Sequence, residues 1–326
     1  MAYFELHPID PFRLDLTVWV LRRQAHNAMD VWNRGTYLRT WHYRGGLLTL
    51  RLWQSHGPSD PVLEGEIYEG PDDADAIAWA GARLNWILGL DRDRSSLYNA
   101  LIVKDAGLAP LMDRYHGFSP PRFDSLYEGL INAVACQQLS LSVGITLLNR
   151  LCRLCAGDTG STRSILPFPT PQRLLEQDPA LLRDIGFSHP KIRSLRAVAQ
   201  AALDGELNER VWHTQARDLI ETRLVQLPGI GRWSAEYVLL RALGHLDVFP
   251  GDDVGGRKGL LHWLGAHATA VGYEDTLAHL KPWAPYGGMI YFFMLLRRLE
   301  QEGHIAIDKE KHPSDNTATD DVGARP

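Results

Sequence analysis

The chain has 326 residues, with 34 Lys and Arg against 39 Asp and Glu, which gives a formal net charge of −5 at pH 7. Hydrophobic residues make up 45% of the sequence and charged residues 22%, as is typical of a globular protein with a large core. The longest apolar run, residues 289–296, is too short to cross a bilayer, and the N-terminus lacks the basic and apolar regions of a signal peptide. We therefore expect a cytoplasmic protein with no membrane partner.

The cysteines are Cys136, Cys152 and Cys155, too few for a disulfide framework or for a cluster held by four thiolates. Cys152 and Cys155 form a CxxC pair inside an apolar helical stretch, which is open to a redox or metal interpretation. Small buried side chains are the interpretation that the apolar surroundings favour. We expect no iron–sulfur cluster.

Negative charge is concentrated at the C-terminus. Residues 300–326 contain seven acidic and three basic side chains, which together carry −4 of the net charge. The polar composition of residues 304–326 predicts an acidic, disordered tail. The rest of the chain is nearly neutral, which neither indicates nor excludes a nucleic-acid partner.

Residues 1–95 carry the strand patterns. TYLRTWHY and LLTLRLW alternate in polarity on either side of Gly45 and Gly46, which predicts a β-hairpin. VLEGEIYEG predicts a further strand, and a helical pattern with an acidic first turn begins at Asp73. We expect a small α+β domain, with an antiparallel sheet and helices, over residues 1–95.

Residues 96–303 carry helical patterns instead. Two helices are predicted across residues 123–155, with a break near Gln138 and a serine, Ser140, in position to cap the second helix. A helix, hairpin and helix follow over residues 216–243, and a Gly- and Asp-rich loop spans 247–258. We expect a mainly α-helical core of two subdomains.

The hairpin LPGIGRW combines a proline with two glycines that tolerate backbone angles other residues resist. Such a turn can aim backbone N–H groups outward from the start of the next helix, which makes an anion site suited to a DNA phosphate. The backbone carbonyls of Leu227 and Ile230 are candidate ligands for a monovalent cation, Na⁺ or K⁺, beside that phosphate. The alternative is a turn packed in the core. The hairpin residues are Leu227, Pro228, Gly229, Ile230, Gly231 and Arg232.

Two adjacent carboxylates, Asp252 and Asp253, follow a Pro-Gly turn in the next loop. Adjacent carboxylates at a turn are usually solvated caps. If the hairpin binds a phosphate, Asp252 or Asp253 is also a candidate for stabilising positive charge in a reaction.

The stretch LPGIGRWSAEYVLLRALG, followed by HLDVFPGDDVGGRK, resembles the helix-hairpin-helix (HhH-GPD) DNA glycosylase superfamily. FDSLYEGLINAVACQQLS, FPTPQRLLEQDPALLRDIGFSHPKIRSLRAVA and KPWAPYGGMIYFFML resemble the branch that contains DNA-3-methyladenine glycosylase II. The resemblance covers about residues 121–297. It implies that the N-terminal α+β domain is of the TATA-binding-protein-like kind found in that branch.

The resemblance implies a catalytic aspartate in a P-x-x-D pattern, which is Asp253 here, with Asp252 supporting the turn. Family members that also cut the DNA strand carry a lysine where this chain has Trp233. The resemblance therefore implies a monofunctional enzyme of base excision repair, without lyase activity, that flips out and hydrolyses alkylated purines such as 3-methyladenine and 7-methylguanine.

An aromatic pocket for the flipped base, and a side chain that fills the gap left in the duplex, are also implied. Gln138 and Leu139 occupy the place of that wedge, although the glutamine is more polar than the plug of many relatives. The candidate pocket walls are Trp233, Tyr237, Trp283 and Trp19.

One departure from the family is the sequence Val254-Gly255-Gly256 after the aspartate, where relatives carry larger residues. We expect a looser segment and a pocket that is wider or less preorganised. The expected partner is double-stranded DNA with damaged bases, bound by a monomer, nucleoid-associated in a bacterium. The alternatives are a module that binds DNA or damage without catalysis, and a glycosylase of the same fold that prefers deaminated bases.

Overall fold

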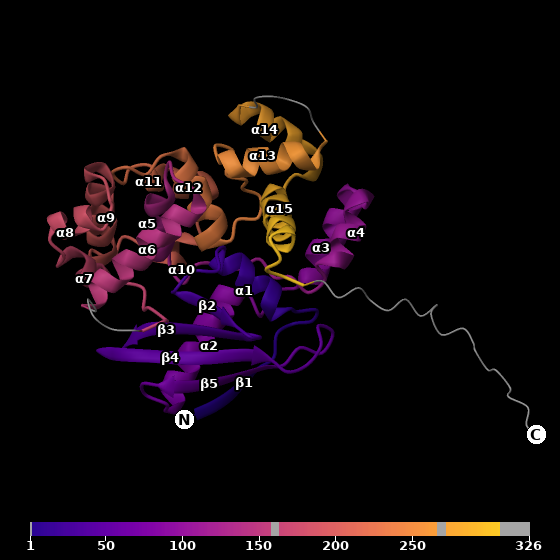
Figure 1. Ribbon diagram of the computed structural model, residues 1–326. Helices are drawn as coiled ribbons and strands as arrows, with labels where there is room; N and C mark the ends of the chain where they lie inside the picture. Colours follow the sequence, from indigo (N-terminus) through magenta and orange to yellow (C-terminus); the bar gives the residue numbers. More distant parts are fainter. Residues whose placement is uncertain (1, 158–162, 266–271, 307–326) are drawn as a thin grey trace, which may run out of the picture.

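The computed structural model describes residues 2–157, 163–265 and 272–306. The N-terminal part is a five-stranded sheet with helices packed beside it (Figure 1). Its elements are β1 (Ala2–Leu6), α1 (Leu14–Arg22), β2 (Asp30–Asn33), β3 (Thr36–Tyr43), β4 (Gly46–Gln54), β5 (Leu63–Glu69) and α2 (Ala74–Leu88).

Every strand pair in this sheet is antiparallel, in the order β1-β5-β4-β3-β2. The predicted hairpin is present: Tyr43 of β3 pairs with Gly46 of β4, and the two turn residues have φ of 47° (Arg44) and 79° (Gly45). Two consecutive positive φ angles are the turn geometry that matches the twist of a hairpin. The edge strands β1 and β2 were not predicted, because their short segments carry little alternation.

The remainder of the described chain contains no strand and is mainly helical, as predicted. Its elements are α3 (Arg94–Lys104), η1 (Ala106–Leu108), α4 (Ala109–Arg114), α5 (Leu126–Cys136), α6 (Leu141–Ala156), α7 (Pro171–Leu175), α8 (Pro179–Asp184), α9 (His189–Leu203), α10 (Glu209–Trp212), α11 (Arg217–Leu224), α12 (Arg232–Val238), η2 (Leu239–Leu243), α13 (Val254–Trp263), α14 (Tyr273–Leu280), η3 (Lys281–Trp283) and α15 (Gly287–Gln301).

Side-chain caps set several of these helix starts. Asp73 caps α2 by accepting the Ala76 N–H, and Ser140 caps α6 by accepting the Val143 N–H, at the break that the sequence predicts. The helix after the hairpin departs from expectation: α12 continues as a π-helix, η2, which ends at Gly244 in the left-handed region with φ of 79°.

Helix α1 connects the sheet to the helical core. Leu14, Val18 and Leu21, spaced by four and three residues, pack into the core that includes the sheet, α2 and α5. Leu16 and Trp19 pack instead into a second core with α15 and the α3–α4 segment. A helix that is apolar on several faces is expected when it is enclosed on several sides. Consequently α1 lies beside α15 in the middle of the molecule (Figure 1).

The predicted domain limit at residue 95 does not coincide with a break in packing, since the first core runs from the sheet into α5, α6 and α9. The predicted tail, 304–326, lies mostly outside the described residues. Its expected disorder is wrong for the first positions: His304 stacks on Trp19 with ring centroids 4.6 Å apart, and Ile305 is buried. Among the described helices, none combines the length and apolar character needed to span a membrane.

Candidate active site

A cleft of about 1310 Å³ opens between the hairpin, the α5–α6 turn and the helices α13 and α15. Its walls come from segments far apart in the sequence: the end of α1, residues 136–141, the start of α9, residues 229–237 and residues 252–263, together with α15. In Figure 1, α13 and α14 form a lobe above α15, on the other side of the molecule from α5, α6 and α9.

The hairpin between α11 and α12 forms one wall of the cleft. Its turn is closed by a hydrogen bond from the Ile230 N–H to the Leu227 carbonyl oxygen, at 3.0 Å. Gly229 has φ of 78°, and a Cβ at this position would lie 1.9 Å from Oγ of Ser194 on α9. Gly231, with extended backbone, starts α12, whose first N–H groups have no partner within the helix. A side chain at residue 229 would therefore displace Ser194 and strain the turn.

Gln137 fixes the hairpin to the α5–α6 turn, a role that sequence reasoning missed. Its side-chain amide donates to the Gly229 carbonyl oxygen at 2.8 Å and to Oγ of Ser234 at 2.9 Å. A polar side chain at the end of the apolar helix α5 was the available signal. The predicted wedge residues follow directly: Gln138 has φ of 56°, and the Leu139 side chain is 43% exposed beside the cleft.

The Asp253 carboxylate lies in the cleft with a hydrogen bond to each oxygen. As the N-cap of α13, it accepts the Gly256 N–H at Oδ1, at 2.5 Å. Its Oδ2 accepts the Trp233 indole N–H at 3.2 Å. The start of α13 thus binds Oδ1 of Asp253, and Oδ2 points across the cleft toward Trp233 of α12.

Asp252 does not share this position. Its Oδ2 forms an ion pair with Arg232 at 2.7 Å, and the Arg232 guanidinium lies over the Tyr273 ring, 3.7 Å from its centroid. The adjacent carboxylate is therefore neutralised by the hairpin arginine, which leaves Asp253 as the carboxylate of the pair without a basic partner among the described residues. The supporting role of Asp252 stays a prediction.

Glu236 holds the loop before α13, and it was not predicted either. Its buried carboxylate accepts the Gly251 N–H at 3.0 Å and the Tyr273 hydroxyl at 2.5 Å. Burial raises the pKa of Glu236, while both hydrogen bonds oppose that shift. A carboxylate among the buried residues of α12 was the signal that sequence reasoning passed over.

The structure brings Trp233 and Tyr237 together as predicted. One helical turn apart on α12, their rings stack with centroids 5.4 Å apart and an interplanar angle of 19°. Trp233 is half-buried at the cleft, and Tyr237 is buried behind it. The Tyr237 hydroxyl accepts a hydrogen bond from Arg23, at 2.6 Å.

Trp283 and Trp19 are not brought to the cleft. The Trp283 indole N–H donates to Asp105 at 2.8 Å within the second core, and Trp19 is buried under His304. Both are packing residues in this structure. The cleft is lined instead by Trp263, at the end of α13, and by Tyr291 of α15. Burial and the charge of Asp253 raise the pKa of the Tyr291 hydroxyl.

The two glycines that depart from the family pattern, Gly255 and Gly256, lie in the first turn of α13. A Cβ on Gly256 would approach Asp253 and Phe249 to 3.3 Å, whereas one on Gly255 would approach only Asp253, at 3.2 Å. Both glycines thus stand in a capped helix start and not in an irregular loop, and the expectation of a looser segment stays a prediction.

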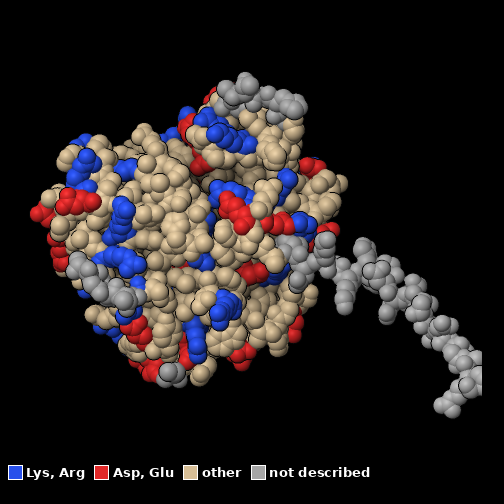
Figure 2. Space-filling model, viewed as in Figure 1, with Lys and Arg blue, Asp and Glu red and all other residues tan. Residues whose placement is uncertain are grey.

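Basic side chains outnumber acidic ones in the cleft. Asp252 and Asp253 are its acidic residues, against the basic residues Arg23, Lys191, Lys258, Arg297 and Arg298. On the face seen in Figure 2, Lys and Arg are scattered among acidic side chains rather than gathered in one continuous surface. An anionic ligand would therefore be attracted locally, despite the negative net charge of the chain.

Comparison with known proteins agrees with this geometry. Residues 131–285, which contain the hairpin, Gln137 and Asp253, match the profile described as HhH-GPD superfamily base excision DNA repair protein. DNA-3-methyladenine glycosylase 1 of Schizosaccharomyces pombe is 38% identical over 164 residues, which span 49% of this chain and 67% of that protein. The chain belongs to the HhH-GPD superfamily.

Solved structures show how far the fold extends. The 3-methyladenine DNA glycosylase of Archaeoglobus fulgidus superposes with a TM-score of 0.74 at 22% identity, over 91% of this chain and 98% of that one. The fold predicted for the whole chain, an N-terminal antiparallel sheet followed by a helical HhH-GPD core, is thereby confirmed. The S. pombe 3-methyladenine DNA glycosylase in complex with abasic DNA superposes with a TM-score of 0.50 at 29% identity. The aligned region covers 62% of this chain and 95% of that one. Part of this HhH-GPD chain therefore lies outside the region aligned with that structure.

Proposed function

We propose that the protein is a monofunctional DNA glycosylase that flips a damaged purine out of duplex DNA and hydrolyses its bond to the sugar, with 3-methyladenine and 7-methylguanine as substrates. The observation that carries the proposal is the Asp253 carboxylate, held in the cleft by Gly256 and Trp233 without a basic partner among the residues described. The relatives named 3-methyladenine glycosylases support the choice of substrate.

The proposed chemistry needs one carboxylate. Breaking the base–sugar bond leaves positive charge on the deoxyribose, as in glycoside hydrolysis, and a fixed anion beside the sugar stabilises that charge. At about 4 Å and an effective dielectric near 20, the attraction is worth roughly 4 kcal/mol, which corresponds to about a thousandfold in rate. Asp253 would also orient the attacking water.

The aromatic residues would receive the base. The exposed face of Trp233 offers a stacking surface worth roughly 1–3 kcal/mol, which offsets part of the cost of flipping. Because Trp233 donates its N–H to Asp253, the carboxylate makes the indole ring more electron-rich, which favours a cationic alkylated base. Leu139, apolar and exposed at the turn that Gln138 makes, is the side chain that we propose as the wedge.

The hairpin would bind a DNA phosphate through the backbone N–H groups at the start of α12. The Leu227 carbonyl oxygen already accepts one hydrogen bond, from Ile230, and keeps a lone pair for a ligand. The donor set of Leu227 and Ile230 carbonyls suits a monovalent cation, Na⁺ or K⁺, which would add positive charge beside the phosphate.

Base release from methylated duplex DNA tests the proposal, with the wild type beside Asp253→Asn and Asp252→Asn. We expect the wild type to release 3-methyladenine, with strands broken only after alkali, since Trp233 replaces the lysine of lyases. Asp253→Asn should lower the rate by about a thousandfold while DNA binding persists. Asp252→Asn, whose partner is Arg232, should lower it less than about tenfold. Binding without release by the wild type would instead support a non-catalytic module, and strand breaks without alkali would contradict the monofunctional mechanism.

A further inference from the structure

Arg23 is the residue of the N-terminal region that lines the cleft. Among the residues that line it, Arg23 alone precedes residue 136. It is the C-cap of α1, in the left-handed region with φ of 63°, and its N–H donates to the Trp19 carbonyl oxygen. The end of α1 therefore places this side chain where the helical core has its base-stacking residues.

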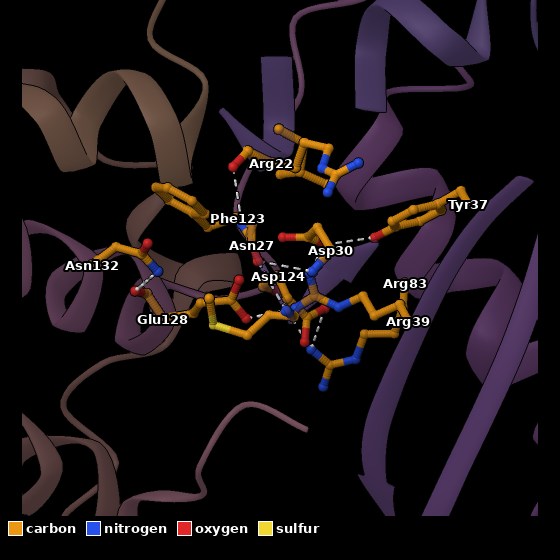
Figure 3. A network of polar contacts seen from close by, with 12 residues as sticks. Arg22, Asn27, Asp30, Tyr37, Arg39, Arg83, Phe123, Asp124, Glu128 and Asn132 are labelled. Carbon is orange, nitrogen blue, oxygen red and sulfur yellow. Dashed lines mark hydrogen bonds and ion pairs between the residues drawn. The ribbon is translucent and has the colours of Figure 1, made fainter. Parts of the chain in front are cut away.

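The guanidinium is held rigidly from two sides. It donates to the Tyr237 hydroxyl and to Oδ1 of Asn132, both at 2.6 Å, and the residue is 3% exposed. The Asn132 amide in turn donates to the Glu128 carbonyl oxygen at 2.9 Å, one turn earlier on α5, a contact drawn in Figure 3. A guanidinium fixed in this way keeps its position when a ligand enters.

Its charge is not neutralised by a bonded carboxylate. Its side-chain partners Tyr237, Asn132 and Cys136 are neutral groups, and no ion pair to Arg23 occurs within the described part of the chain. The Asp30 carboxylate acts on Arg23 without a direct bond. A second buried guanidinium, that of Arg241, donates to the backbone carbonyl of Val20 and also lies close enough to Tyr237 to influence it. The buried end of the pocket therefore has an excess of positive charge behind the Trp233–Tyr237 stack.

We propose that Arg23 is a specificity-determining residue, whose fixed positive charge disfavours lesions that are themselves cationic relative to neutral lesions. Two like charges about 8 Å apart at an effective dielectric near 20 repel each other enough to change an equilibrium constant by roughly thirtyfold. Asp253 and the DNA phosphates offset part of this repulsion. A neutral base that presents a carbonyl oxygen to the same end of the pocket gains attraction instead.

This role rests on the proposed glycosylase function and assigns a selectivity to the same site. The electron-rich Trp233 favours a cationic base, and Arg23 opposes it, so the two residues together set the balance between lesion classes. Arg23 directly follows α1, which packs against α15, so the N-terminal region takes part in base selection as well as in support.

The test compares release of 3-methyladenine, whose nucleoside is cationic, with release of hypoxanthine, which is neutral, under single-turnover conditions. The proteins are the full-length wild type, Arg23→Gln, Arg23→Met and Arg23→Lys. We expect both uncharged variants to raise the ratio of the 3-methyladenine rate to the hypoxanthine rate by about tenfold. Arg23→Lys, which keeps the charge, should stay near the wild-type ratio. Tyr237→Phe removes the hydrogen bond from Arg23 but keeps the charge, and should also leave the ratio unchanged.

A purely structural role for Arg23 would lower both rates together and leave their ratio unchanged in every variant, and that result would overturn the proposal. Release of 3-methyladenine alone by all variants would overturn it as well. If the wild type releases neither base, the proposed function itself is wrong, and the proposal for Arg23, which rests on it, is rejected as well. Thermal melting of each variant identifies any that has not folded, and the two uncharged side chains provide independent measurements.

Discussion

The Trp233 indole N–H donates to Oδ2 of Asp253 at 3.2 Å, across the cleft edge between the start of α12 and the start of α13. The contact joins Trp233, on which we propose that the base stacks, to Asp253, which we propose lies beside the sugar. A nucleotide bound with its base on Trp233 would therefore have its sugar close to Asp253.

We expect Trp233→Phe to lower the single-turnover rate of base release by about tenfold, because phenylalanine keeps a stacking face but has no N–H to orient the carboxylate. Trp233→Ala should cost more, since base stacking is also lost. The matched control is Trp263→Phe, at a cleft tryptophan without a described hydrogen bond to Asp253. A Trp233→Phe enzyme as fast as the wild type would show that the contact does not orient Asp253.

The hairpin glycines provide a second pair of variants. Gly229→Ala should lower the free energy of unfolding by about 1–3 kcal/mol, because φ of 78° is unfavourable for alanine and its Cβ would collide with Ser194. Gly231→Ala should fold normally, since this residue has extended backbone and nothing lies within 4 Å of the added Cβ.

If the hairpin binds DNA through its backbone, the methyl group of Gly231→Ala lies where the phosphate approaches, and affinity should fall several-fold with stability unchanged. Urea unfolding and fluorescence anisotropy with duplex DNA separate the two effects. Unchanged affinity for Gly231→Ala would contradict the proposed phosphate site.

The sequence was sufficient for features that depend on local chemistry. The β3–β4 hairpin was predicted from the alternation on either side of Gly45 and Gly46, α2 from the helical pattern with an acidic first turn that begins at Asp73, and the α5–α6 break from Ser140. Each signal acts within a few residues. The pairing of Trp233 with Tyr237 likewise follows from one helical turn.

Features that depend on distant segments were not predictable. Nothing near Trp283 in the sequence indicates that its indole N–H binds Asp105, 178 residues away, rather than facing a base. The hydrogen bond from Arg23 to Tyr237 joins residues that are 214 positions apart, and it depends on how α1 packs against both cores. Such contacts follow from the tertiary fold and not from periodicity, motif or spacing.

Gln137→Ala should weaken the hold of the α5–α6 turn on the hairpin. The substitution removes two hydrogen bonds and leaves the Gly229 carbonyl oxygen without that donor, so the free energy of unfolding should fall by about 1–2 kcal/mol. DNA affinity should fall with it, because the hairpin would be less preorganised. Gln138→Ala, at the adjacent exposed position, serves as the control and should change stability by less than about 0.5 kcal/mol. Equal unfolding free energies for the two variants would exclude the proposed fixation.

The buried network between the sheet and α5 predicts a pH dependence of stability (Figure 3). Arg39 donates to Asp30 at 2.5 Å and to Glu128 at 2.6 Å, and all three side chains are at most 4% exposed. One guanidinium can neutralise only one of two carboxylates. Burial therefore raises the pKa of Glu128 to about 7, although Arg39 opposes the shift.

A carboxyl group whose folded pKa lies above its unfolded value stabilises the fold below the unfolded pKa, and that contribution is lost as pH rises through the folded pKa. For Glu128 the window runs from its ordinary pKa of 4.5 to about 7. The wild type should therefore lose stability relative to Glu128→Gln, by roughly 1–3 kcal/mol, between about pH 5 and pH 8. Chemical unfolding of both proteins at a series of pH values measures this difference, and the subtraction removes the titration of all other groups. Parallel pH profiles would mean that Glu128 remains ionised in the folded protein throughout this range, with Arg39 overcoming the effect of burial.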